Sequence, residues 1–317
     1  MNAVPVRFIE SVLRTSGPSP CQVGQISGVW GKARAAYEKK TFRLHLTYIG
    51  RQERSLHYIL YDWELNDAKT LSLEVLREVA ENIGEIEFHA TEDRTRNNEW
   101  QSVSPELEKG LLRLVLRLDV PKKVLKLSYC PDLYEELKSR YYNLLRSFTS
   151  LELTSFDDRS IVGIVQDTVS SGRLRSISVD QMVPATVLTT DFWVDYFFSP
   201  RCEALSVTFE DHGFSVVLGI INRWKRRRPG ALSPNKTIDK LIVDPNELLD
   251  AGMIQMSVDS IDAEILGRIQ RRGETCERID SFYRIEHPMD SSSNIYAVFF
   301  EQLRIWGRRW FKCILLF

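Results

Sequence analysis

Two clusters of acidic residues have the composition that catalysis would need, and each follows a predicted strand. Asp157 and Asp158 form the first cluster, and Glu210, Asp211 and His212 form the second. A carboxylate beside a histidine can act as a catalytic base whose orientation the neighbour fixes. The same residue types also cap helices, because an aspartate accepts hydrogen bonds from the free N–H groups of a first helical turn. We expect capping at both positions.

No catalytic motif accompanies these clusters. The chain contains no GxGxxG, GxxxxGK, HExxH or GxSxG pattern, and its five cysteines form no CxxC pair. His45 and His57 are expected to face each other across a predicted hairpin, but no third metal ligand lies near them in the sequence. We therefore predict that the protein is not an enzyme and that it holds no metal or cofactor.

One dense basic run stands out, formed by Lys225, Arg226, Arg227 and Arg228 directly after Trp224. Such a run suits a nuclear import signal or a phosphate-binding patch. A structural role is the alternative, because cations stabilise the C-terminus of a helix and the Pro-Gly pair that follows would end a helix there. These four residues are our candidate basic signal.

The last residues predict an amphipathic helix. Apolar and aromatic side chains recur at spacings of three and four, with basic residues on another side. The recurring residues are Leu303, Trp306, Trp310, Cys313 and Phe317. An aromatic face beside basic residues suits a membrane-surface or partner-binding helix. The alternative is a helix that packs on the end of the fold.

The elements that would position these residues follow from a repeated pattern in the middle of the chain. Four short apolar alternations recur at spacings of 26, 26 and 28 residues, with helical stretches between them. They are Leu125-Lys-Leu127, Leu151-Glu-Leu153, Ile177-Ser-Val179 and Leu205-Ser-Val207, and fainter copies lie at 86–88 and 241–243. This period is typical of a leucine-rich repeat array. Because one such unit cannot bury its own apolar face, the units are expected to stack.

The predicted fold is therefore α/β: a leucine-rich-repeat-like solenoid of short parallel strands and helices, with an N-terminal cap of helices and a hairpin. Helices are predicted at 106–117, 133–146, 159–170, 187–198 and 214–227, and extended pairs at 42–60 and 282–300. We divide the chain into a helical segment at 1–40, a hairpin and helix at 41–83, the array at 84–244 and a capping region at 245–317.

The first forty residues carry a resemblance to a known family. Pro5, Phe8 and Val12 at the start of an apolar helix pattern, followed by a second helix pattern with Trp30, resemble an F-box. The repeats and the extended tail are similar to the F-box-like, repeat-bearing families expanded in nematodes. The resemblance implies an adaptor whose F-box docks on the Skp-type linker of a cullin ubiquitin ligase through these four residues, while the repeats hold a substrate.

This sequence departs from the F-box pattern at one point. The central leucine-rich part is replaced by the short, proline-interrupted stretch 16–22. A proline-led helix with a buried tryptophan would also serve as a plain N-terminal cap of the array. The alternative to a ligase adaptor is therefore a free-standing repeat scaffold.

Composition limits the remaining possibilities. The 317 residues include 43% hydrophobic and 27% charged residues and carry a net charge of −1, so no electrostatic argument favours nucleic acid or an anionic membrane as a partner. No apolar run reaches the roughly 18 residues of a membrane span, and the first fifteen residues lack the apolar core of a signal peptide. We expect a cytoplasmic protein, or a nuclear one if the basic run acts as an import signal. Its expected function is non-enzymatic protein–protein recognition.

Overall fold

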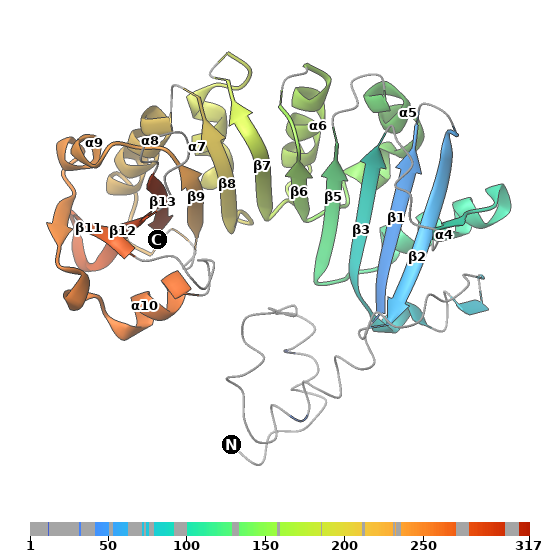
Figure 1. Cartoon of the computed structure of the whole chain (residues 1–317), viewed down its shortest axis with the longest axis horizontal. Coiled ribbons are helices and arrows are strands. Elements are labelled where there is room, and N and C mark those ends of the chain that lie inside the picture. Colours follow the sequence, from blue (N-terminus) through green and yellow to red (C-terminus); the bar gives the residue numbers. More distant parts are fainter. Residues whose placement is uncertain are drawn as a thin grey trace. The chain divides into compact units, whose positions relative to one another are not determined.

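The computed structural model describes residues 12, 32, 42–50, 53–62, 72, 74–75, 79–91, 100–128, 133–156, 159–184, 186–210, 213–230, 232, 236–270, 279–301 and 311–317. Within these residues the chain is mixed α/β, with thirteen strands and seven α-helices (Figure 1). The chain divides into two compact units, Met1–Glu152 and Leu153–Phe317.

Parallel strands form the centre of the first unit. Strand β3 (Ile83–Thr91) pairs in parallel with β1 (Phe42–Ile49) on one side and with β5 (Lys122–Leu127) on the other. Strand β2 (Ser55–Asp62) returns antiparallel to β1, and the two-residue β4 (Gln101–Ser102) pairs antiparallel with β2. The order is therefore β5-β3-β1-β2-β4, and the predicted hairpin at 42–60 is confirmed.

Two α-helices of the first unit, α4 (Pro105–Arg117) and α5 (Leu133–Leu145), lie where helices were predicted. Helix α4 begins at a cap: the Leu107 N–H donates to the Ser104 hydroxyl at 3.3 Å, and proline occupies the first helical position. Both features suit the start of a helix, because the first N–H groups have no partner within the helix: the serine accepts from one of them, and the proline lacks one. A short 3-10 turn, η2 (Ala80–Asn82), leads into β3.

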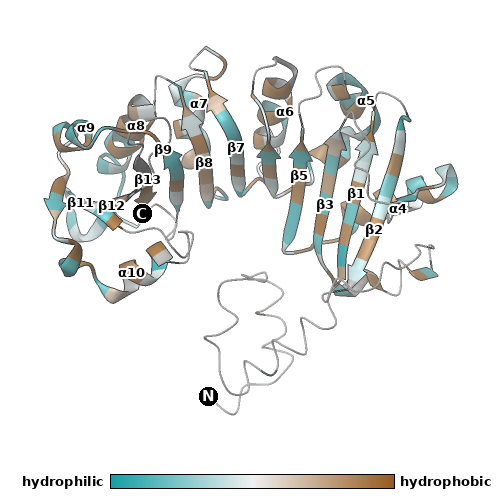
Figure 2. Cartoon of the chain, viewed as in Figure 1, coloured by the Kyte–Doolittle hydropathy of each residue, from teal (hydrophilic) through white to brown (hydrophobic). Residues whose placement is uncertain are grey.

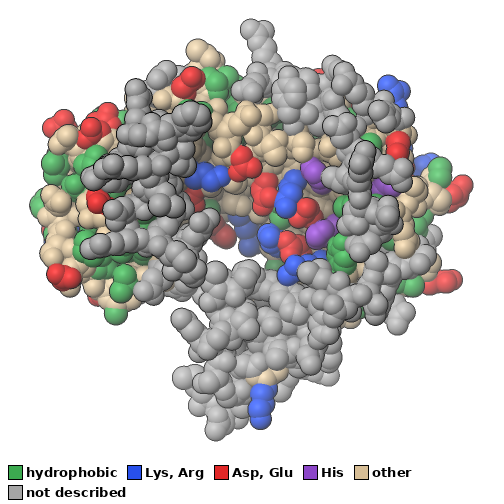
Figure 3. All heavy atoms as spheres, in the orientation of Figure 1, with side chains coloured by type: hydrophobic (Ala, Val, Ile, Leu, Met, Phe, Trp, Pro, Cys, Tyr) green, Lys and Arg blue, Asp and Glu red, His purple; other side chains and the backbone are tan. Residues whose placement is uncertain are grey.

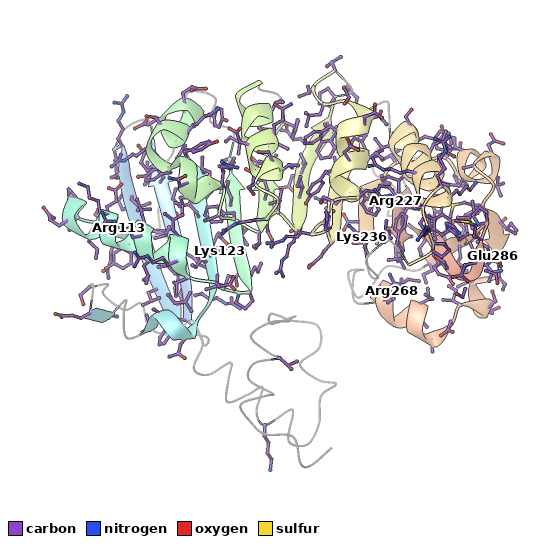
Figure 4. All side chains as sticks on the ribbon, turned by 180° about the vertical axis from the view of Figure 1, so that it is seen from behind. Arg113, Lys123, Arg227, Lys236, Arg268 and Glu286 are labelled. Carbon is purple, nitrogen blue, oxygen red and sulfur yellow. The ribbon has the colours of Figure 1, made fainter. Side chains whose placement is uncertain are left out.

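Helix α5 covers one face of this sheet. The ring of Tyr141 meets the rings of Tyr48 on β1 and Phe88 on β3 edge-on, at 5.4 and 5.8 Å between centroids. Lys123, also on this face, is buried and donates from Nζ to the Val115 carbonyl near the end of α4 at 2.8 Å (Figure 4). A cation is stable there because carbonyl groups at a helix C-terminus carry partial negative charge.

Side chains alternate between this covered face and the opposite one. Along β1, Leu44, Leu46 and Tyr48 on the covered face are fully buried. On the opposite face Arg43 and His45 are half-buried, whereas Thr47 and Ile49 further along are buried. Figure 2 shows the resulting bands of hydrophobic and hydrophilic residues along the strands. This period of two is the geometry of a strand with one face in the core.

The second unit repeats the parallel arrangement. Strand β8 (Ala204–Phe209) pairs in parallel with β7 (Ser176–Val183) and with β9 (Thr237–Leu241). Helices α6 (Arg159–Ser170), α7 (Thr190–Phe197) and α8 (Gly213–Lys225) alternate with the strands.

All eight residues of the predicted repeat strands lie in strands and are at most 5% exposed. They are Leu125 and Leu127 in β5, Leu151 and Leu153 in β6 (Ser150–Leu153), Ile177 and Val179 in β7, and Leu205 and Val207 in β8. The predicted α/β character, with parallel strands and intervening helices, is confirmed.

Antiparallel strands continue the second unit beyond β9. The order is β9, β13 (Phe311–Leu316), β12 (Asp290–Glu301), β11 (Ile279–His287) and β10 (Ile254–Met256), and every neighbouring pair is antiparallel. The predicted extended pair at 282–300 is therefore confirmed. The connecting region contains α9 (Pro245–Asp250), η3 (Val258–Ser260) and α10 (Ala263–Gln270).

The predicted C-terminal helix is wrong for the residues that the structure describes. Phe311–Leu316 form β13, which pairs with β12 and β9. Cys313 and the three residues after it are at most 2% exposed. A continuous apolar run suits a strand that is buried on both faces, and a spacing of three and four across so short a run does not distinguish the two structures. Leu303, Trp306 and Trp310 lie outside the described residues.

A core substitution tests this fold. Leu205 on β8 is 0% exposed, and Leu249 on α9 is 44% exposed. Leu205→Ala is expected to lower the free energy of unfolding by about 2–5 kcal/mol, because it leaves a cavity in the core. Leu249→Ala, the same change at the surface, should alter it by only about 0.5 kcal/mol. Urea unfolding of both variants gives the comparison, and equal effects would contradict this placement of the core.

Candidate functional site

The face of the first unit that α5 leaves uncovered carries a group of ionisable side chains, which we call the charged strand face. Figure 3 shows basic, acidic and histidine side chains gathered on this face. Strand register places Glu85 beside both Arg43 and Lys122, and His89 beside Lys126. The complete set is Arg43, His45, Glu85, Glu87, His89, Lys122, Lys126 and Glu152.

Glu85 joins three strands of this face. Its carboxylate lies 2.6 Å from Lys122 Nζ on β5 and 3.5 Å from Arg43 Nε on β1. Glu85 is 9% exposed, whereas the Lys122 side chain is 49% exposed. Two cations on neighbouring strands therefore neutralise one largely buried carboxylate.

Lys126 shows the opposite arrangement, in which one cation lies between two carboxylates. Its ammonium lies 3.0 Å from Glu87 on β3 and 3.4 Å from Glu152 on β6. Burial disfavours the charged ammonium, but its hydrogen bond to Glu87 and the two negative charges outweigh that effect and raise the pKa of Lys126. The Lys126–Glu152 pair is the more exposed of the two, with side chains 37% and 44% exposed. Exposed ion pairs contribute only about 0–1 kcal/mol, so a partner's charges can replace this pair at low cost.

Two histidines lie among these charges. His89 Nε2 is 2.8 Å from the Ser128 hydroxyl, and the ring of His45 packs edge-on against Tyr61 at 5.5 Å. Burial lowers the pKa of both histidines, although the carboxylate of Glu87 acts in the opposite direction. Both are therefore neutral at pH 7 and gain charge on acidification.

Contrary to the prediction, His45 and His57 do not lie directly opposite each other across the hairpin. His57 lies opposite Thr47 and His45 opposite Ile59, so the two share a face but sit two positions apart along the hairpin. His57 is buried, with Nε2 at 2.8 Å from the Ser55 hydroxyl and 3.0 Å from Glu53. Within the described part of the chain, no group of three or more His, Cys, Asp or Glu is placed to hold a metal ion.

The basic run lies at the end of α8, which ends at Lys225 as the helix-end alternative predicted. Lys225 Nζ donates to the Ala251 carbonyl at 3.1 Å, and the Arg227 guanidinium lies 4.6 Å from the centre of the Phe198 ring. Arg226 and Arg228 are exposed. The import-signal interpretation stays a prediction.

The other predicted residues fall largely outside the described ranges. Pro5, Phe8 and Trp30 lie there, and of the four F-box positions only Val12 is described, as a half-buried helical residue. Of the two acidic clusters only Glu210 is described; it is exposed, and its N–H donates to the Val183 carbonyl at 3.1 Å. The remaining cluster residues, Asp157, Asp158, Asp211 and His212, also lie outside.

Sequence reasoning did not identify the charged strand face, although a signal was present. Each predicted repeat strand has a polar residue between its two apolar ones, and in β5 and β6 these are Lys126 and Glu152. Alternation alone places both on the face opposite the core. The contacts of Lys126 with Glu87 and with Glu152 depend on strand register, which the sequence does not reveal.

Comparisons of the chain with protein-family models, with curated proteins and with solved structures found no match. Among the described residues, no helix has both the length and the apolar character needed to cross a membrane.

Acidification is expected to destabilise the first unit through His45 and His89. Since their pKa values in the folded protein lie below the usual value of about 6.5, the unfolded chain binds more protons than the folded chain below that pH. The free energy of unfolding should therefore fall as the pH drops from about 7.5 to about 5.5. Urea unfolding across this range measures the slope. The double variant His45→Gln/His89→Gln should show a shallower slope, and an unchanged slope would contradict the assignment.

Proposed function

We propose that this protein is a non-enzymatic recognition scaffold that binds a partner protein through the charged strand face. One observation carries the proposal: seven ionisable side chains of β1, β3 and β5 lie in cross-strand register on a face that α5 does not cover, and Glu152 of β6 joins them through its ion pair with Lys126. We also propose that the alternating strands and helices belong to a leucine-rich-repeat-like solenoid, for which the spacing of 26 to 28 residues is the support.

The chemistry of this face suits a protein partner better than a small molecule. Both signs of charge alternate across neighbouring strands, as in the pairs of Glu85 with Lys122 and of Lys126 with Glu87. Alternating charge selects a partner by position rather than by net charge, and it guides the encounter between complementary surfaces. The net charge of −1 is consistent with this, because it gives no general attraction to a polyanion.

The F-box resemblance supports a narrower form of the proposal, a substrate-recruiting adaptor of a cullin-type ubiquitin ligase. In that form the residues around Phe8 and Trp30 bind a Skp-type linker, and the charged strand face binds the substrate. The free-standing scaffold is the alternative, in which only the charged strand face binds a partner.

Charge reversal tests the role of the charged strand face. Lys126→Glu places a third carboxylate beside Glu87 and Glu152, and it is expected to abolish capture of a partner. Arg113→Glu is the matched control, since Arg113 is an exposed residue of α4 (Figure 4). Quantitative mass spectrometry of proteins captured from cell extract by each variant and by the unmodified chain gives the readout. A partner retained by Lys126→Glu but lost with Arg113→Glu would contradict the proposal.

The adaptor form has its own test. The unmodified chain is expected to co-purify with a Skp-type linker, and Phe8→Ala should weaken this binding with little change in thermal melting, because aromatic anchors carry much of an interface's energy. If these residues only cap the fold, the same change should instead lower stability by roughly 3–5 kcal/mol. A large loss of stability, together with no linker binding by the unmodified chain, would leave the free-standing scaffold.

A further inference from the structure

An open cavity of about 590 Å³ lies in the second unit, bordered by the end of α8, by α10 and by the first half of β12. We call it the arginine cavity. Its walls include Trp224, Arg227, Arg228, Arg268, Asn294 and Tyr296. The volume falls within the roughly 300–1,000 Å³ that is usual for small-ligand sites. Figure 4 labels two of these residues: Arg227 follows the end of α8, and Arg268 lies on α10.

Two of these arginines form no ion pair with a carboxylate of the described residues. Among the described residues, neither Arg227 nor Arg228 has a carboxylate within ion-pair distance. Arg223, one turn earlier on α8, shows the contrast, because it forms an ion pair with Asp195. Arg227 instead stacks on Phe198, which holds its guanidinium in place while leaving the charge uncompensated.

Two acidic residues, Asp290 and Asp262, also line the cavity and reduce its positive charge. The Asp290 carboxylate accepts hydrogen bonds from the N–H and the hydroxyl of Ser292, at 3.0 and 2.7 Å. These bonds lower the pKa of Asp290 and hold its carboxylate against Ser292, two residues along the chain. Arg268, the third arginine, donates to a backbone oxygen of Phe317, which also lines the cavity, at 2.7 Å. The cations that the lining offers to a ligand are therefore Arg227 and Arg228.

Asn294 provides a second kind of polar group. Its amide nitrogen donates to the carbonyls of Ser291 and Ser292, both at 3.2 Å. Its Oδ1 is buried and has no hydrogen-bond partner among the described residues. A buried acceptor without a donor costs stability. Tyr296, stacked on Phe282 at 5.5 Å, adds an aromatic surface.

We propose that the arginine cavity binds a phosphate monoester attached to an apolar or aromatic group. Guanidinium groups pair with oxyanions through two parallel hydrogen bonds, and a phosphate offers three acceptor oxygens and close to two negative charges. Arg227 and Arg228 contact the phosphate, and Tyr296 contacts the apolar part. The phosphate comes either from a free small molecule or from a phosphorylated side chain of a protein. This site is independent of the charged strand face.

The test uses the full chain in a buffer free of phosphate, with phenyl phosphate as the probe and calorimetry as the measurement. Saturable binding is expected for the unmodified chain. Arg227→Gln and Arg228→Gln should each weaken binding roughly tenfold. Arg226→Gln is the matched control, because Arg226 is an exposed neighbour in the same run and does not line the cavity; its affinity should be unchanged. Circular dichroism verifies that each variant is folded.

Two further ligands complete the experiment. A phosphotyrosine peptide that binds more tightly than phenyl phosphate would identify a protein as the source of the phosphate, whereas equal affinity would identify a small molecule. Benzoate, with one charge and the same ring, is expected to bind more weakly. The proposal is overturned if phenyl phosphate does not bind in the millimolar range, if benzoate binds equally well, or if Arg226→Gln weakens binding as much as Arg228→Gln.

Discussion

The alternation of side chains along parallel strands is the constraint on which the rest of the first unit depends. Phe88 is buried against α5, and its strand neighbours Glu87 and His89 point the other way. A slip of one residue would bury the charges and expose Phe88. Burying a large apolar side chain contributes about 1.5–3 kcal/mol, against about 0–1 kcal/mol for an exposed ion pair. The core therefore fixes the register, and the ion pairs of the charged strand face follow from it. Among these pairs, the one between Lys126 and Glu152, whose side chains are both more than a third exposed, can exchange with a partner's charges without disturbing the fold.

Sheet edges impose the second constraint, because an unpaired edge strand invites association with other strands. In the first unit the edge strand β4 is two residues long, and in the second unit β10 is three residues long. The last strand of the chain, β13, lies between β9 and β12, so β9 is paired on both sides. Lys240 adopts φ = 60° near the shift in register between β9 and β13, where a parallel pairing gives way to an antiparallel one. Short edge strands limit the backbone available for unintended pairing.

Local patterns predicted much of this fold, because local physics determines those parts. Strand positions such as Leu205 followed from alternation. Helix α6 ends just before Gly172, whose φ of 67° suits glycine and whose N–H donates to the Val169 carbonyl at 3.0 Å. The C-terminal strand was missed because a short apolar run fits a strand or a helix, and only pairing with β12 and β9 decides between them. Neither the charged strand face nor the arginine cavity could be predicted, since each requires contacts between residues that are distant in sequence.

The basic run shows how the fold changes the meaning of a sequence pattern. In the sequence its four cations are equivalent, but the end of α8 separates them: Lys225 donates to the Ala251 carbonyl, Arg227 stacks on Phe198, and only Arg226 and Arg228 are exposed. Binding an oxyanion requires only that two cations converge on one place. Arg227 and Arg228 both line the cavity whose lining also includes Asn294 and Tyr296 of β12. The arrangement therefore suits a local anion site, and the import signal stays a prediction.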